Sequence, residues 1–139
     1  MELQKLFHFD CPEEVYKADA CALSCFDYRF DTAVRKFFRR RGVETVDHIK
    51  IPGSAKALAA PDRESDRDFV LSMVRTSVRL HRPDRMLIFG HNECGAYPGA
   101  PPETVAADVT CAAAVVRAAI PELPVECYFC DFDGVYQIV

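Results

Sequence analysis

Two short groups of residues carry side chains that can bind a transition metal. The first group contains Cys25, Asp27 and Arg29, and the second contains His91 and Cys94, three residues apart. Thiolate sulfur and imidazole nitrogen are preferred ligands of Zn²⁺, and catalytic zinc sites use three protein ligands and keep a fourth position open. His91 and Cys94 can reach one ion from a turn. Together with Cys25 they predict a zinc site of the catalytic type.

Each group follows a segment that is expected to be a buried strand. The apolar run 20–26 ends at the first group, and residues 85–90 form the clearest buried strand of the sequence, directly before His91. In parallel sheets, functional groups gather at the carboxyl ends of the strands. We therefore expect both groups at the same edge of one sheet. A cysteine at a strand end is often only a core residue, so the two groups together support the metal site better than either alone.

The rest of the chain predicts alternating helices and strands. Apolar periodicity and breaker residues indicate further strands at 46–51 and 125–132, a short return at 135–139, and helices at 31–41, at 65–81 and from 101 onward. This order predicts an α/β fold with a mostly parallel sheet flanked by helices, of about four strands and the short return. The 139 residues contain no repeat or long linker, so we expect a single domain over residues 1–139.

The two groups resemble the signature of the β-class carbonic anhydrases. That family has Cys-x-Asp-x-Arg at the end of its first strand and His-x-x-Cys, usually followed by Gly, after a later strand. Here Cys25 to Arg29 reads Cys-Phe-Asp-Tyr-Arg, and His91 to Gly95 reads His-Asn-Glu-Cys-Gly. The run 87–91 is similar to the family's strand before the second motif, and the resemblance extends over residues 20–132. It implies a β-carbonic-anhydrase-like fold.

The resemblance also implies reversible hydration of carbon dioxide to bicarbonate. Zinc lowers the pKa of a bound water towards ~7, and the zinc-bound hydroxide attacks carbon dioxide. Asp27 would orient this hydroxide as a hydrogen-bond acceptor, and Arg29 would keep Asp27 ionised and in place. An ordinary surface ion pair is the alternative for these two residues, and Asp27 instead of water is an alternative fourth ligand beside Cys25. Glu93 is either a solvated loop carboxylate or a proton acceptor near the metal.

Two other functions use the same metal ligands. Zinc-activated hydroxide can attack the carbon of carbonyl sulfide or carbon disulfide in the same way, and a narrower, more apolar entrance would favour these substrates. A noncatalytic protein would keep the zinc for folding or for binding a partner. Turnover of carbon dioxide against a metal-free control separates catalysis from a noncatalytic role, and release of sulfide identifies the sulfur-containing substrates.

Charge and composition exclude other classes of protein. The net charge of −4 argues against binding to nucleic acid, and the basic run 39–41 suits the end of a helix. No stretch approaches the ~18 apolar residues that span a bilayer. Residues 1–5 show no signal-peptide core, so we expect a cytoplasmic protein that does not bind membranes and whose cysteines are reduced. A short chain with exposed sheet edges also predicts a homodimer or a larger homo-oligomer.

The remaining cysteines and histidines predict structural roles. Cys127 and Cys130 lie three apart in an apolar strand and therefore face opposite sides, unlike a redox pair at a helix N-terminus. We expect burial for the cysteines without ligand-like neighbours, and surface or hydrogen-bonded positions for the other histidines: Cys11, Cys21 and Cys111, and His8, His48 and His81.

Overall fold

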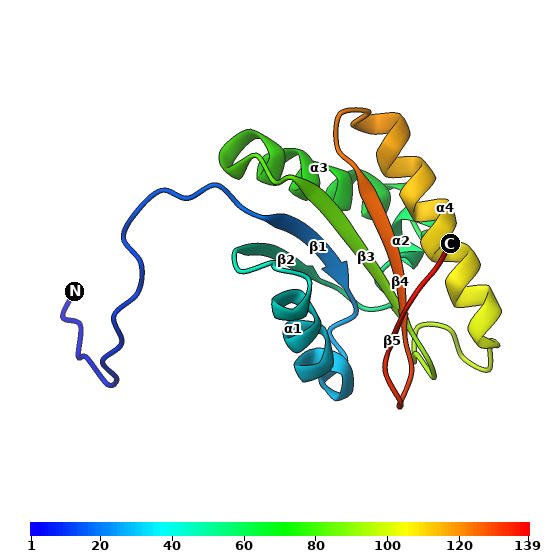
Figure 1. The fold of residues 1–139 in the computed structure, drawn as a ribbon, viewed down its shortest axis with the longest axis horizontal. Helices are drawn as coiled ribbons and strands as arrows, with labels where there is room; N and C mark the ends of the chain where they lie inside the picture. Colours follow the sequence, from blue (N-terminus) through cyan, green and yellow to red (C-terminus); the bar gives the residue numbers. More distant parts are fainter.

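A five-stranded sheet forms the centre of the computed structural model, which describes residues 1–139. The strands lie in the order β2-β1-β3-β4-β5. Their bounds are β1 Ala20–Ser24, β2 Val46–Lys50, β3 Arg85–His91, β4 Val125–Cys130 and β5 Val135–Gln137. The first four strands run parallel, and β5 pairs antiparallel with β4 (Figure 1). The expected parallel sheet with a short return strand is confirmed.

Helices cover both faces of this sheet. They are α1 Asp31–Arg40, α2 Lys56–Ala59, α3 Glu64–His81 and α4 Pro102–Ala119, with a 3-10 turn, η1, at Tyr28–Phe30. Helices α2, α3 and α4 pack on one face and α1 on the other (Figure 1). Short parallel strands joined by helices give this layered arrangement because each crossover places its helix on a face of the sheet. None of the helices is long and apolar enough to span a membrane.

The central strand β3 is buried on both faces and fixes the position of the site. Met86 and Ile88 face the core under α3 and α4, whereas Leu87 and Phe89 face the core under α1. This alternation is the period of two that a strand imposes on its side chains. Gly90 follows in close contact with α4, since a Cβ there would lie 2.7 Å from a methyl group of Val105. The end of β3, where His91 is the last residue, is therefore packed closely against α4.

The cysteines of the core follow this alternation in part. Cys127 and Cys130 belong to the cores on opposite faces of the sheet, which confirms the prediction, and Cys21 is fully buried. The expectation for the other two was wrong, because Cys111 and Cys11 are exposed. Cys111 lies on the solvent side of α4, whose inner positions are taken by neighbouring alanines, and Cys11 belongs to the N-terminal segment.

Residues 1–17 form no helix or strand and extend away from the sheet (Figure 1). The segment joins the body near the amino end of β2, where Tyr16 donates a hydrogen bond to Asp47 (2.7 Å) and the N–H of Ala18 donates to the carbonyl of His81 (2.8 Å). Its apolar side chains, such as Leu6 and Phe7, are exposed. The sequence of this segment shows no apolar periodicity. Helix α2 was not predicted either, because a helix of four residues is too short to show a periodic pattern.

Candidate metal centre

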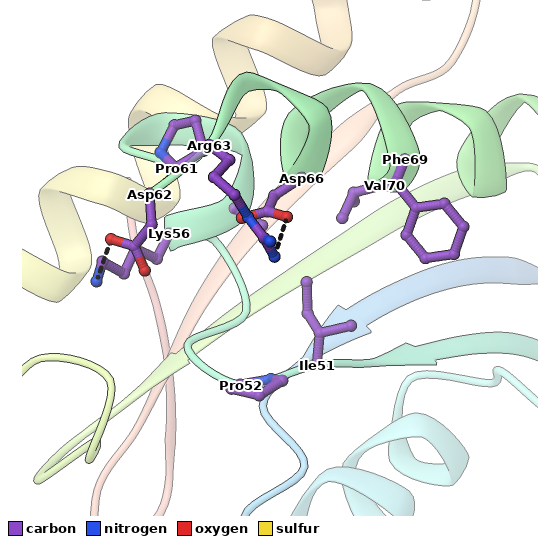
Figure 2. A pocket seen from close by; sticks show the side chains of 10 residues that line it. Ile51, Pro52, Lys56, Pro61, Asp62, Arg63, Asp66, Phe69 and Val70 are labelled. Carbon is purple, nitrogen blue, oxygen red and sulfur yellow. Dashed lines mark hydrogen bonds and ion pairs between the residues drawn. The ribbon is translucent and has the colours of Figure 1, made fainter.

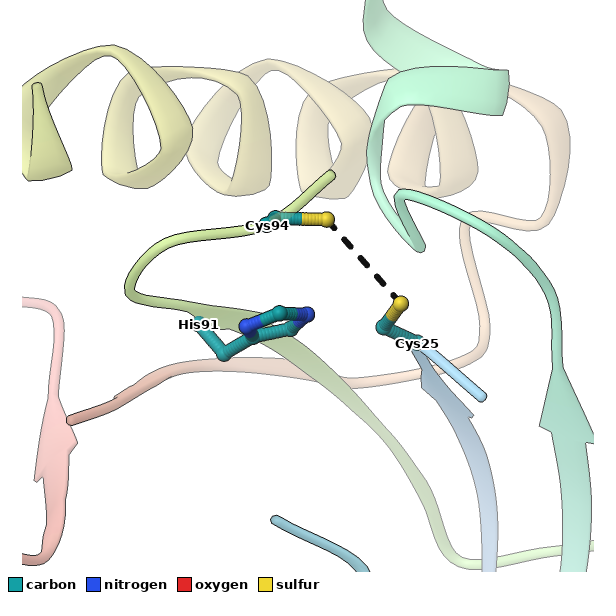
Figure 3. A group of neighbouring side chains, drawn as sticks. All are labelled: Cys25, His91 and Cys94. Atoms are coloured by element: carbon teal, nitrogen blue, oxygen red, sulfur yellow. Dashed lines mark hydrogen bonds between the residues drawn. The ribbon is translucent and has the colours of Figure 1, made fainter. Parts of the chain in front are cut away.

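The carboxyl ends of β1 and β3 bring the two groups of ligands together. The two strands pair in parallel, beginning with Ala20 opposite Arg85. The segments that follow β1 and β3 therefore leave the sheet at the same edge. Cys25 directly follows β1, His91 is the last residue of β3, and Cys94 lies in the turn beyond. The three side chains gather at this edge (Figure 3). The predicted common edge is therefore observed.

The spacing of the three side chains suits one small ion. Their ligand atoms all lie within 4.8 Å of one another. The two sulfur atoms of Cys25 and Cys94 are 4.0 Å apart. In a tetrahedral zinc site with Zn–S bonds of ~2.3 Å, two sulfur atoms lie about 3.8 Å apart. The observed separation needs only a slight contraction to match that geometry.

His91 presents a free nitrogen to this space. Its Nδ1 lies 2.8 Å from the carbonyl oxygen of Asn92. Because a carbonyl can only accept, Nδ1 carries the proton and Nε2 keeps its lone pair, which is the tautomer of a metal ligand. Nε2 is buried and has no hydrogen-bond partner, the only buried side-chain nitrogen or oxygen in the structure without one. A buried polar atom without a partner is costly, and a metal ion bound there would satisfy it.

The two thiols differ in their tendency to ionise. Burial opposes ionisation of Cys25, but the imidazole of His91 in its protonated form and the backbone N–H groups of Asp27 and Gly53 outweigh it and lower its pKa to about 7. Burial, and then the neighbouring Cys25, raise the pKa of Cys94. Metal ligands must be deprotonated, and a bound cation favours the second thiolate as well. The donor set therefore fits a divalent ion such as zinc.

Asp27 lies beside the ligands and is fixed by Arg29. The guanidinium donates to both carboxylate oxygens, from Nη2 to Oδ2 at 2.8 Å and from Nε to Oδ1 at 3.1 Å. The backbone N–H of Arg29 also donates to Oδ1 at 3.0 Å, so Asp27 caps the turn η1. These bonds hold the pKa of Asp27 below its usual range. The ionised carboxylate lies with Oδ2 4.0 Å from Nε2 of His91.

Arg29 also contacts the second motif, which an isolated surface ion pair would not do. Its Nη2 donates to the carbonyl oxygen of Glu93 at 3.2 Å, and its Nη1 lies 3.8 Å from the Glu93 carboxylate. Glu93 has a left-handed backbone with φ of 52°, supported by the Asn92 side chain, which accepts its N–H at 3.0 Å. Such a conformation is strained for a residue other than glycine, and it turns the chain so that Cys94 faces Cys25.

The loop after β2 completes the site, a role that its sequence did not indicate. Gly53 has a φ of 74°, and a Cβ there would lie 2.8 Å from the Cβ of Ala96 in the metal-ligand loop. Lys56 donates to the carbonyl oxygen of Ala96 at 3.2 Å. The sequence 52–54 indicated only the end of a strand. An open groove of about 510 Å³ lies between this loop and the two cysteines, with Phe26 and Tyr28 at its rim.

A second pocket, of about 310 Å³, lies beside α2 and the start of α3 (Figure 2). Its charged residues are paired with one another, Lys56 with Asp62 at 3.3 Å and Arg63 with Asp66 at 3.3 Å. Phe69 lies at its margin and is exposed. This pocket includes none of the candidate ligands Cys25, His91 and Cys94, and its carboxylates are paired with basic side chains, so we assign it no chemistry.

The other histidines are not members of the candidate metal group. His48 bonds through Nε2 to the hydroxyl of Ser24 at 2.7 Å. His81 bonds through Nδ1 to Asp47 at 2.9 Å, and His8 is exposed and lies 3.3 Å from Asp10. The prediction that these histidines are hydrogen-bonded or at the surface is confirmed.

A protein-family model described as "Putative carbonic anhydrase" matches residues 15–139 of the chain. Solved structures with a similar fold include a β-carbonic anhydrase from Trichomonas vaginalis, with a TM-score of 0.65, 16% identity, and coverage of 99% of this chain and 88% of that one. A carbonic anhydrase from Streptococcus mutans gives a TM-score of 0.67 at 12% identity, covering 95% and 89%.

Tetrameric β-carbonic anhydrases from Sordaria macrospora give a TM-score of 0.61 at 14% identity, covering 88% of this chain and 81% of theirs. No curated protein matches the sequence. At these low identities, the likeness to solved structures establishes the fold.

Proposed function

The chain belongs to this carbonic anhydrase family and has the fold of the β class, and from that premise we propose that it is a zinc enzyme that reversibly hydrates carbon dioxide to bicarbonate. One observation supports the proposal above all others. The buried Nε2 of His91 has no partner and lies within 4.8 Å of the two cysteine sulfur atoms. In this proposal Cys25, His91 and Cys94 hold the metal and leave its fourth position open.

When bound, zinc lowers the pKa of water towards ~7 and so supplies a hydroxide nucleophile near neutral pH. The protein must orient that nucleophile. Asp27 is suited to this task because its ionised carboxylate can only accept hydrogen bonds, and it lies next to His91. A hydroxide that donates its proton to Asp27 keeps a lone pair directed at the carbon of the substrate.

Arg29 determines where the Asp27 carboxylate lies. Because it engages both carboxylate oxygens, Arg29 keeps Asp27 ionised and holds it away from the open metal position. Its bond to the carbonyl of Glu93 fixes the guanidinium relative to the metal-ligand loop. We assign Asp27 as a catalytic residue and Arg29 as its positioning residue.

We further propose that the chain acts as a homodimer or a larger homo-oligomer. The exposed apolar side chains of residues 1–17 support this, as does β2, which is an edge strand with one open side. The structurally similar enzymes from Sordaria macrospora are tetrameric. Sedimentation at micromolar concentration is expected to show a dimer or larger species, and a monomer alone would contradict this.

A hydration assay tests the proposed reaction. The protein loaded with zinc is expected to speed the formation of bicarbonate above the uncatalysed rate. A chelator should abolish the activity and added zinc should restore it. Zinc-loaded protein that gives only the uncatalysed rate would contradict the proposal. Release of sulfide from carbonyl sulfide or carbon disulfide under the same conditions would instead identify a sulfur-containing substrate.

A further inference from the structure

The guanidinium of Arg29 lies against two aromatic rings that the sequence did not connect with the site. Its central carbon Cζ lies 5.6 Å from the centre of the Phe30 ring and 5.4 Å from the centre of the Phe132 ring. The centres of the Phe30 and Phe132 rings are 5.4 Å apart, and the planes of the two rings are tilted by 33° to each other. An arginine at this distance from an aromatic face is attracted to it. The in-plane N–H groups remain free for Asp27 and Glu93.

Phe30 lies between Arg29 and the metal ligand His91 and contacts both. Its ring lies 4.6 Å from the imidazole of His91, and the residue is only 6% exposed. Phe30 therefore contacts both the metal ligand His91 and the arginine that holds Asp27. Phe132 differs because it is 60% exposed. Its contact with Arg29 is thus not a consequence of core packing.

The turn between β4 and β5 holds Phe132 in this position. The side chain of Asp131 accepts the backbone N–H groups of Asp133 at 2.7 Å and Gly134 at 2.9 Å. The N–H of Asp131 donates to the carbonyl of Gly134 at 3.0 Å, which closes the turn. Asp side chains commonly stabilise tight turns in this way. The Phe132 ring in this turn lies beside Arg29.

We propose that Phe132 is a positioning residue that holds Arg29 against Asp27. The proposal rests on the function proposed above, in which Arg29 fixes the catalytic carboxylate. Without the ring, the guanidinium loses the contact on its face and can move away from Asp27. The expected effect is modest, because a cation–π contact at an exposed site corresponds to about a two- to fivefold change in an equilibrium.

Three variants separate the aromatic face from simple apolar cover. Phe132→Leu keeps an apolar side chain and removes the ring, whereas Phe132→Tyr keeps the ring. Phe69→Leu is the matched control, because Phe69 is 63% exposed and lies on α3 away from the site. We expect zinc content and the free energy of unfolding to be similar in all of them. The rate of carbon dioxide hydration should fall about two- to fivefold in Phe132→Leu alone.

A second measurement does not depend on catalysis. In the zinc-loaded protein, nitrogen-15 NMR follows the exchange of the Arg29 Nε proton with water. This group lies 3.1 Å from each oxygen of Asp27, so its proton should exchange slowly. Phe132→Leu should speed the exchange about two- to fivefold, and Phe132→Tyr and Phe69→Leu should leave it unchanged.

The outcomes distinguish this proposal from the proposed function. Faster exchange in Phe132→Leu alone supports the positioning role, even if the protein proves unable to hydrate carbon dioxide. Wild-type exchange and wild-type activity in Phe132→Leu would overturn the positioning role. Loss of zinc or of folding in Phe132→Leu, or an equal loss of activity in Phe132→Tyr, would also overturn it, because Phe132 would then be structural.

Discussion

Two clusters of polar side chains lie towards opposite ends of the sheet and differ in how completely they are paired. At the carboxyl ends of β1 and β3, Nε2 of His91 is buried without a partner, and the thiols of Cys25 and Cys94 face each other. The only strained non-glycine residue of this loop, Glu93, lies between the two ligands His91 and Cys94. We call Cys25, His91 and Cys94 the metal edge. This cluster contains a buried polar atom, Nε2 of His91, that has no hydrogen-bond partner.

The other cluster surrounds Asp47 near the amino end of β2. Its carboxylate accepts hydrogen bonds from Ser77 at 2.6 Å, from Tyr16 at 2.7 Å and from Nδ1 of His81 at 2.9 Å. The ring of Tyr16 also stacks on that of His81, with centres 4.2 Å apart. Every member of this Asp47 cluster has a partner. It ties α3 and the end of the N-terminal segment, at Tyr16, to the edge strand β2.

The difference shows what each histidine cluster does. Buried polar groups in native proteins are nearly always paired, so an unpaired one indicates a place for a ligand. A paired network stabilises the fold and needs no ligand. Substitutions at the metal edge should therefore remove metal and activity, and substitutions in the Asp47 cluster should lower stability while leaving the metal bound.

Removal of a metal ligand should have the largest effect. His91→Ala is expected to abolish zinc binding and to lower the hydration rate by more than about 100-fold. Substitution of a residue that only hydrogen-bonds to a metal ligand already lowers metal affinity or activity by about 10- to 100-fold. His81→Gln, in the other cluster, is the control and should retain zinc and activity. Metal analysis of both purified variants measures this. Full zinc occupancy in His91→Ala would remove the basis of the comparison.

Loss of the residues beside the metal should lower activity without releasing zinc. We expect Asp27→Ala and Arg29→Ala to reduce the rate by about 10- to 100-fold with full zinc content. For Arg29→Ala the loss should be largest near neutral pH, because a freed Asp27 competes better with water than with hydroxide for the open position. A pH–rate profile from about pH 6 to pH 9 tests this. Wild-type profiles for both variants would exclude a catalytic role.

A substitution in the Asp47 cluster should act on stability alone. Asp47→Ala leaves the donors of Ser77, Tyr16 and His81 without their acceptor, and we expect it to lower the free energy of unfolding by about 2 kcal/mol. Chemical denaturation of the zinc-loaded proteins measures the change. Zinc content and activity should match those of the wild type. Loss of zinc in this variant would mean that the two clusters are coupled.

The last effect concerns the pH dependence of stability and involves His48, which bonds to Ser24 at the end of β1. Burial, and then the charge of Lys50, lower the pKa of His48 to about 4, below the ~6.5 of an unfolded chain. The unfolded chain therefore binds more protons, so the contribution of His48 to stability is complete above pH ~6.5 and is lost as the pH falls towards about 4. Chemical denaturation at pH 7 and at pH 5 measures the free energy of unfolding. Between these two pH values it should fall less for His48→Gln than for the wild type. Equal losses would contradict it.

The metal edge was predictable from the sequence because its ligands lie in two short motifs directly after strands with clear apolar runs. The fold class implies that Cys25 and His91 lie at the same edge of the sheet, and the direct pairing of β1 with β3 then brings them together. The Asp47 cluster was not predictable, since its members come from distant segments with no local spacing. The contact between Phe132 and Arg29 was not predictable for the same reason, because only the turn before β5 brings the ring to Arg29.

The predictions for Cys11 and Cys111 failed at a finer level. A helix such as α4 has many small apolar residues, and the sequence does not show which of them face solvent when alanines occupy several positions. The loop at Gly53 was interpreted only as a strand end. Its contact with Ala96 depends on the tertiary position of the metal-ligand loop.

X-ray absorption spectroscopy at the zinc edge, on protein purified with zinc available, tests the central claim most directly. The account predicts one zinc ion per chain with two sulfur atoms at about 2.3 Å and nitrogen or oxygen ligands at about 2.0–2.1 Å. This pattern corresponds to Cys25, Cys94 and His91 with one further light atom at the open position. Protein that remains free of zinc, or zinc without sulfur ligands, would contradict the account.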